Sequence, residues 1–158
     1  MPCANLGLLP AFLARITFMF FKLGVNRDDY MEIFAATNRL ILRELIPADA
    51  PGMFELDADK DVHLYLDKPI SSIEEARESI RFIRQQYREN GIGRWAVIEK
   101  ESNRFIGWAG LKLVKEVTNH QVNYYDLGYR FIKKYWGKGY ATEAAIASLD
   151  YGFNTLKA

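Results

Sequence analysis

The hydrophobic and polar positions of the chain change character at about residue 31. Before that point, residues 6–21 are almost wholly apolar and carry one charge, Arg15. This run is shorter than the roughly 20 residues of a membrane-spanning helix, and a central arginine makes insertion costly. We therefore expect no membrane association and interpret residues 1–30 as a hydrophobic N-terminal extension of doubtful role. A helix packed on the domain or on a partner, and a membrane anchor, are the alternatives.

From residue 31 onward, strand-like alternation and helix-like periodicity follow one another along the chain. The predicted elements are, in order, a strand at 39–45, a short helix from the N-cap Asp49 to Ala58, a helical turn at 63–66, a long helix at 72–90, strands at 94–99, 105–114 and 121–131, and a last helix at 140–153. This order predicts an α+β fold in which a hairpin-rich sheet is flanked by helices.

The long helix carries the clearest signals. Ser71 with Glu74 and Ser72 with Glu75 both match a capping box at its start, and Asn90-Gly91 suits its end. Apolar residues repeat every three or four positions and so share one face: Ile73, Ala76, Ile80, Ile83 and Tyr87. The opposite face carries a row of arginines that includes Arg84. We interpret this row as a solvated helix surface rather than as a basic patch for a ligand.

The composition excludes some classes of function but does not assign one. Lys and Arg together number 21 and Asp and Glu number 20, so the net charge of +1 gives no general attraction to nucleic acid, and we expect no nucleic-acid partner. A single cysteine, Cys3, excludes an internal disulfide. With it, the distant His63 and His120 make no zinc cluster, so we expect no metal. We interpret both histidines as loop or helix-surface residues rather than as ligands or bases. A reducing, cytoplasmic location is the default.

A glycine loop joins the third predicted hairpin strand to the last helix. Gly137 and Gly139 allow the backbone to come close to a ligand, and the amides of a helix start attract anions. Lys133, Lys134 and Lys138 add positive charge nearby. A P-loop requires Gly-Lys-Ser/Thr and a dinucleotide fingerprint requires a third glycine, and the loop has neither. The segment therefore predicts an anion site of another kind.

The residues around this loop resemble a known family. Residues 134–144, with the sequence KYWGKGYATEA, are similar to the acetyl-CoA-binding motif of the GNAT acetyltransferase superfamily, and DLGYRF at 126–131 is similar to its fourth strand. The resemblance covers residues 31–158, and the nearest branch is that of the ribosomal-protein alanine N-acetyltransferases. It implies the GNAT fold, with a mixed, mainly antiparallel sheet. It also implies acetyl transfer from acetyl-CoA to a primary amine, of a protein N-terminus or a small molecule, by direct attack in a ternary complex.

The chain departs from the family pattern in three places. Lys134 stands where the family usually has Arg or Gln, and Asp126 stands where this branch often has Glu. Family domains also continue beyond the motif helix with a fifth strand, another helix and two more strands. We therefore expect residues 31–158 to be the N-terminal and central part of a GNAT domain. A non-catalytic remnant that at most binds coenzyme A is the alternative.

The resemblance also implies roles for individual residues. Asp126 would be the base or would orient the amine, and the Tyr129 amide, at a strand bulge, would stabilise the oxyanion. Backbone groups of Tyr129, Arg130 and Phe131 would bind the pantetheine arm. Lys134 would add a donor to the cradle, and the amides of six residues would hold the pyrophosphate: Gly137, Lys138, Gly139, Tyr140, Ala141 and Thr142. The partner would be a small-molecule or peptide amine, and an exposed edge of the last strand would favour a homodimer.

Overall fold

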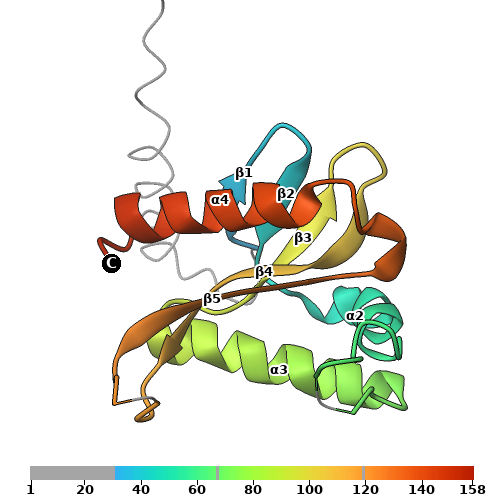
Figure 1. Cartoon of the computed structure of the whole chain (residues 1–158), viewed down its shortest axis with the longest axis horizontal. Coiled ribbons are helices and arrows are strands. Elements are labelled where there is room, and N and C mark those ends of the chain that lie inside the picture. The colour runs from blue at the N-terminus through green and yellow to red at the C-terminus, as the bar shows by residue number, and fades with distance from the viewer. Residues whose placement is uncertain (1–30, 67, 119) are drawn as a thin grey trace, which may run out of the picture. The chain divides into compact units, whose positions relative to one another are not determined.

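Five antiparallel strands form the sheet, and they pair in chain order (Figure 1). The computed structural model describes residues 31–66, 68–118 and 120–158, so the predictions for residues 1–30 lie outside the described residues. The strands are β1 (Ile33–Ala36), β2 (Leu40–Arg43), β3 (Trp95–Glu99), β4 (Arg104–Val114) and β5 (Tyr124–Phe131). Within the described part of the chain, β5 is therefore an edge strand.

Helices cover both faces of this sheet. They are α2 (Ala50–Asp57), α3 (Ile73–Asn90) and α4 (Tyr140–Asn154), with short 3-10 turns η2 (Pro47–Asp49) and η3 (Lys133–Tyr135). Figure 1 shows α4 on one side of the sheet and α2 and α3 on the other. Helix α4 packs against β4 and β5, and helix α2 packs against α3 and β4. The predicted α+β arrangement is confirmed.

Strand β1 was not predicted from the sequence. It is four residues long, and its central Phe34 stacks on Trp95 with ring centroids 4.8 Å apart. Tyr151 of α4 meets Trp95 edge-on at 5.1 Å, and Trp95 is fully buried. Such aromatic contacts stabilise a core beyond the area they bury. A strand this short shows no periodicity in the sequence, and its partners lie far along the chain.

Helix α3 follows the prediction except at one arginine. The Ser72 hydroxyl accepts a hydrogen bond from the Glu75 amide, and Gly91 ends the helix in the left-handed conformation. Arg84, however, is not on a solvated surface. Its Nη1 donates to the carbonyl of Leu45 at 2.9 Å, and its side chain is 17% exposed. A long arginine at the flank of an amphipathic helix can satisfy a buried carbonyl, and periodicity does not show this.

Asp49 is also placed differently from the prediction. It does not cap α2 with its side chain. Its carboxylate accepts from the amide of Ile46 at 2.9 Å and forms a salt bridge with Arg43 at 2.7 Å. The Asp49 carboxylate thus closes the turn before α2 and fixes it to strand β2. Residues 63–66 form turns rather than a separate helix.

The bulge predicted at Tyr129 is absent from the strand pairing. Residues 107–114 of β4 pair with residues 124–131 of β5 without a register shift. The irregularity lies on the other side of β4, where Val97 pairs with Gly107 but Ile98 pairs with Phe105. The extra residue, Ile106, is therefore accommodated between β3 and β4, which leaves β5 straight along β4.

Candidate functional site

The glycine loop presents a row of free amides at the start of α4. Gly137 and Gly139 have φ values of 72° and 79°, in the left-handed region. No side chain caps α4. The amides of the six residues 137–142 donate no hydrogen bond to any described residue, whereas the next amide, of Glu143, donates to the carbonyl of Gly139. Successive unpaired amides at a helix start form an anion-binding concavity.

The turn between β1 and β2 holds this loop in place. Arg39 donates from Nη1 to the carbonyl of Lys138 at 3.0 Å and from Nε to Glu143 at 2.7 Å. The Thr37 hydroxyl donates to the same carboxylate at 2.5 Å, and the Arg39 guanidinium lies 4.4 Å from the centre of the Tyr140 ring. Burial raises the pKa of Glu143, but the hydrogen bonds from Thr37 and Arg39 outweigh it and leave the pKa below its ordinary value. Neither Thr37 nor Arg39 was predicted as a site residue, because no local sequence pattern connects them with a loop a hundred residues away.

The edge of β5 offers further backbone groups. The amide of Ile132 donates to the carbonyl of Ile106, so this pair is hydrogen-bonded. Bonded and non-bonded pairs alternate in an antiparallel ladder. The backbone groups of Arg130 therefore face β4 and, contrary to the expectation from the resemblance, are not free for a pantetheine arm. Those of Tyr129 and Phe131 face the open edge. The indole of Trp136 donates to the Phe131 carbonyl at 2.7 Å and occupies part of that edge.

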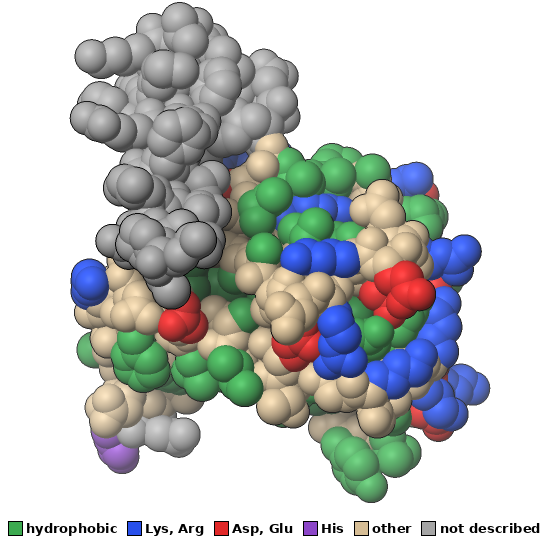
Figure 2. All heavy atoms as spheres, turned by 90° about the horizontal axis from the view of Figure 1, so that it is seen from above, with side chains coloured by type: hydrophobic (Ala, Val, Ile, Leu, Met, Phe, Trp, Pro, Cys, Tyr) green, Lys and Arg blue, Asp and Glu red, His purple; other side chains and the backbone are tan. Residues whose placement is uncertain are grey.

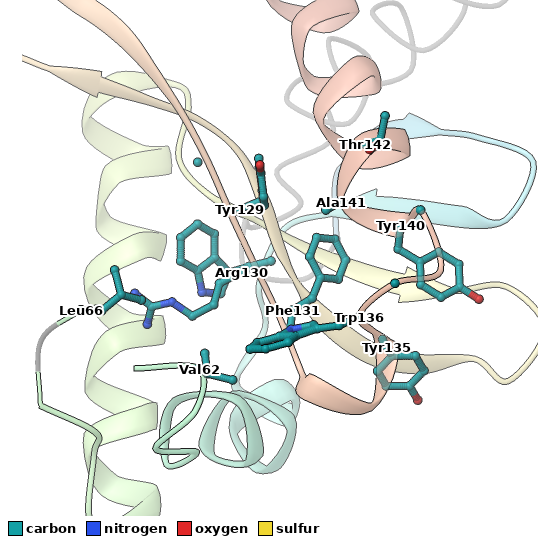
Figure 3. Close-up of a pocket in the computed structure, with 14 residues that line it drawn as sticks. Val62, Leu66, Tyr129, Arg130, Phe131, Tyr135, Trp136, Tyr140, Ala141 and Thr142 are labelled. Atoms are coloured by element: carbon teal, nitrogen blue, oxygen red, sulfur yellow. The ribbon is translucent and has the colours of Figure 1, made fainter. Parts of the chain in front are cut away.

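A cavity of about 590 Å³ runs along this edge to the glycine loop (Figure 3). Eight of the predicted binding residues line it: Tyr129, Arg130, Phe131, Gly137, Gly139, Tyr140, Ala141 and Thr142. Val62, Leu66, Trp108, Gly128, Tyr135 and Trp136 complete its wall. The cavity thus joins the amide row of α4 to the free edge of β5 and continues toward residues 62–66.

The loop lysines lie outside the cavity wall. Lys134 forms a salt bridge with Glu55 of α2 at 2.7 Å, and Lys133 is bound by Asp61. Lys138 lies with its ammonium 5.2 Å from the centre of the Tyr135 ring. Hydrogen bonding to Asp61 raises the pKa of Lys133. The lysines therefore anchor the loop to its surroundings, and the described cavity is shaped chiefly by backbone and aromatic groups.

Asp126 is on the sheet face opposite α4, where Arg94 binds it. Arg94 donates from Nη2 to Asp126 Oδ2 and from Nη1 to the Asp126 carbonyl, the latter at 2.6 Å. Burial lowers the pKa of the Arg94 guanidinium. The guanidinium passes directly over Gly128, where an added Cβ would lie 2.7 Å from Nη2. Asp126 Oδ1 has no hydrogen-bond partner among the described residues.

A second charged cluster lies on the same face. Arg130 donates from Nη1 to Asp57 Oδ1 at 2.6 Å, and its guanidinium is 5.2 Å from the centre of the Trp108 ring. His63 Nε2 lies 3.5 Å from Asp57 Oδ1. His63 lies in the turns at residues 60–66, as expected for a loop residue, but it is buried, at 8% exposed, whereas His120 is exposed. The buried Asp57 carboxylate draws His63 inward, which no sequence pattern indicated.

The comparisons with known proteins agree with this geometry. The family model described as "Acetyltransferase (GNAT) domain" matches residues 39–158. The chain belongs to the GNAT acetyltransferase family. The match begins at Arg39 and includes the whole glycine loop before α4.

The GNAT relatives include proteins and solved structures from bacilli. An "Uncharacterized N-acetyltransferase p20" of Bacillus licheniformis is 32% identical over 121 residues, which cover 76% of this chain and 66% of the relative. A GNAT-family acetyltransferase structure from Bacillus anthracis is 30% identical, with a TM-score of 0.61, over 77% of this chain and 67% of that one. The chain spans about two thirds of the length of these relatives.

A more distant GNAT structure shares the fold. It is RimL, described as the ribosomal L7/L12 alpha-N-protein acetyltransferase, in complex with coenzyme A. It is 20% identical, with a TM-score of 0.61, over 77% of this chain and 67% of that one.

Among the described residues, no group of three or more His, Cys, Asp and Glu side chains is placed to hold a metal ion. Among the helices described, none combines the length and the apolar character needed to cross a bilayer.

Proposed function

We propose that this chain binds acetyl-CoA at the α4 loop and contributes to transfer of its acetyl group to a primary amine. The observation that carries the proposal is the row of six free amides at residues 137–142, which opens into the cavity along β5. Amides at a helix start suit a diphosphate, and the open strand edge suits the amide-containing pantetheine arm. The RimL structure, which has the same fold, is a complex with coenzyme A.

The bound thioester would supply an activated acetyl group, and the chain's own residues would align and polarise it. The carbonyl of Tyr129 and the amide of Phe131 lie on the free edge and would pair with the arm. The Tyr129 amide donates to the acetyl oxygen as that oxygen gains negative charge. Asp126 Oδ1 would accept a hydrogen bond from the acceptor amine and receive its proton, directly or through water, so that the neutral amine can attack the acetyl carbon. The C–N bond would form as the C–S bond of the thioester breaks, and the leaving thiolate would take up the proton that the amine gives up. Arg94 acts as a positioning residue that fixes the Asp126 carboxylate.

The proposed acceptor is the amine of a protein N-terminus or of a small molecule. The proposed location of the reaction is the cytoplasm. RimL is described as acting on the α-amino group of a ribosomal protein. Binding of coenzyme A without turnover is the alternative function for the 158-residue chain. Acetyl-CoA binding is common to both and is therefore tested first.

Calorimetry on matched glycine variants tests the binding site. Gly139→Glu places a carboxylate beside the amide row, and we expect acetyl-CoA to bind at least about a hundredfold more weakly through lost charge-assisted hydrogen bonds and like-charge repulsion. Gly91→Glu is the control, because Gly91 is also left-handed, with φ 69°, and has open space around it. We expect this control to bind acetyl-CoA as the parent chain does. Equal affinity of the Gly139→Glu variant and the parent would refute the site.

A further inference from the structure

We infer that the acceptor carries an anionic group near its amine and that the Arg130 guanidinium binds this group. The inference deepens the proposed function, on which it rests, by naming a substrate class. Among the described residues that line the 590 Å³ cavity, Arg130 is the one charged side chain. Aromatic, aliphatic and glycine residues form most of the remaining wall. Asp57 offsets part of the Arg130 charge, so an anionic group would bind at the N–H donors of the guanidinium that Asp57 does not use.

Neighbouring residues hold the Arg130 side chain in place, and only some of its N–H donors form hydrogen bonds. Asp57 engages Nη1, Trp108 lies beneath the guanidinium, and the side chain is 23% exposed. Its Nε and Nη2 groups have no hydrogen-bond partner among the described residues. Two parallel N–H donors match the two oxygens of a carboxylate, and a guanidinium already held by its neighbours loses little freedom on binding.

The position of Arg130 separates this anion from the phosphates of the coenzyme. Leu111 of β4 lies against Gly152 of α4, and its neighbours Ala109 and Leu113 share that face. Tyr129 pairs with Ala109 and so faces α4, whereas Arg130 pairs with Trp108 and faces α2. In Figure 3 the Arg130 side chain points toward Leu66, away from Tyr140 and the start of α4. The coenzyme phosphates at α4 are therefore on the other side of β5.

The other charged groups on this face do not cancel the free donors. Asp126 is bound by Arg94, and Asp57 is bound by Arg130 itself, with His63 beside it. An acceptor with one amine and one carboxylate thus finds a free Asp126 oxygen and a free Arg130 fork on the same strand face. A peptide whose N-terminal residues include Asp or Glu fits this pattern. A polyamine, which offers only positive charge, would meet repulsion at Arg130.

Titration calorimetry with paired probes tests the inference. The probes are a peptide beginning Ser-Asp-Glu, its amide counterpart beginning Ser-Asn-Gln, free glutamate and spermidine, each added to the chain saturated with coenzyme A. We expect the acidic peptide to bind at least about tenfold more tightly than its amide counterpart, the ratio typical of one hydrogen bond to a charged group. Binding of glutamate as tight as that of the peptide would assign the same site to small carboxylate-bearing amines.

Three variants identify the residue. Arg130→Gln should remove the preference for the acidic peptide while leaving the affinity for coenzyme A within about twofold, because the backbone of residue 130 faces β4. Arg130→Lys keeps a charge beside Asp57 and should retain part of the preference, which guards against a folding defect in the glutamine variant. Arg81→Gln, at an arginine 72% exposed on α3, is the control and should change nothing.

The inference and the proposed function fail differently. Equal affinity of the parent chain for the two peptides, no binding of the acidic peptide, or tighter binding of spermidine would overturn the role of Arg130. So would an Arg130→Gln variant that weakens coenzyme A binding instead of peptide selectivity. Failure of the parent chain to bind coenzyme A overturns the proposed function, and the same peptide titrations without coenzyme still test Arg130.

Discussion

Arg39 and Glu143 are 104 residues apart and form a salt bridge of 2.6 Å beside the free amides of α4. The same guanidinium binds the Lys138 carbonyl, so the turn after β1 and the first turn of α4 are joined beside the row of free amides. A contact from residues near the start of the described sequence thus helps to hold the row of free amides in its conformation.

Substitution of Glu143 should weaken coenzyme binding without unfolding the chain. In Glu143→Gln the amide keeps the size of the side chain but loses the charge that holds Arg39. We expect acetyl-CoA to bind about tenfold more weakly by calorimetry, since one or two charge-assisted hydrogen bonds fix the loop. Glu74→Gln, which disrupts an exposed pair with Arg77 on α3, is the matched control. A tenfold loss in both variants would contradict a specific role for Glu143.

The same carboxylate should make stability depend on pH in a defined direction. The pKa of Glu143 in the folded chain is below its ordinary value of 4.5, so the unfolded chain takes up a proton more readily. The stabilisation is therefore complete above about pH 5 and is lost as the pH falls through the folded pKa. Denaturant unfolding of the parent and of Glu143→Gln should differ most near pH 7 and converge toward pH 3. A difference that grows on acidification would contradict this sign.

Gly128 should be required for the position of Arg94. An alanine Cβ there would lie 2.7 Å from Arg94 Nη2, so Gly128→Ala should displace the guanidinium from Asp126. We expect a loss of about 1–3 kcal/mol in the free energy of unfolding, as for other overpacked sites. The double variant with Arg94→Met provides the control, because the alanine then has nothing to displace. If Gly128→Ala costs the same in both backgrounds, the two residues are not coupled.

The Tyr129 amide can be tested by removing its hydrogen. Tyr129→Pro removes a donor that faces the open edge of β5, where proline is tolerated. If this amide stabilises the oxyanion, kcat for acetyl transfer should fall by about 10²–10³-fold. Tyr129→Phe removes only the hydroxyl of a side chain that is 53% exposed and should leave kcat unchanged. Similar rates for the proline and phenylalanine variants would exclude the amide from the reaction.

Features set by neighbouring residues were predictable from the sequence, and features set by distant ones were not. The capped helix α3 and the loop around Gly137 and Gly139 follow from local spacing. Arg39 and Asp57 were missed because their partners, Glu143 and Arg130, lie far along the chain. The burial of His63 was missed because it depends on Asp57, which was itself missed. The bulge expected by resemblance at Tyr129 was wrong, since the extra residue is taken up between β3 and β4 at Ile106.

The outer surface of α4 also could not be predicted from periodicity. Ile146, Leu149 and Phe153 are exposed on it at 63%, 42% and 64%. Figure 2 views the molecule from above, the side on which α4 lies in Figure 1, and shows apolar side chains gathered there. Periodicity identifies an apolar stripe, but it does not tell which of two apolar stripes a helix buries against its sheet.

The free edge of β5 has a consequence for self-association. The indole of Trp136 already donates a hydrogen bond to the Phe131 carbonyl. Another strand that paired with β5 would therefore bind mainly to the outward-facing backbone groups of Leu127 and Tyr129. A second molecule that docked edge to edge would use the same groups as the pantetheine arm. Coenzyme binding and edge-to-edge dimerisation would then exclude each other. The concentration of coenzyme would therefore determine what fraction of the protein is monomeric in solution.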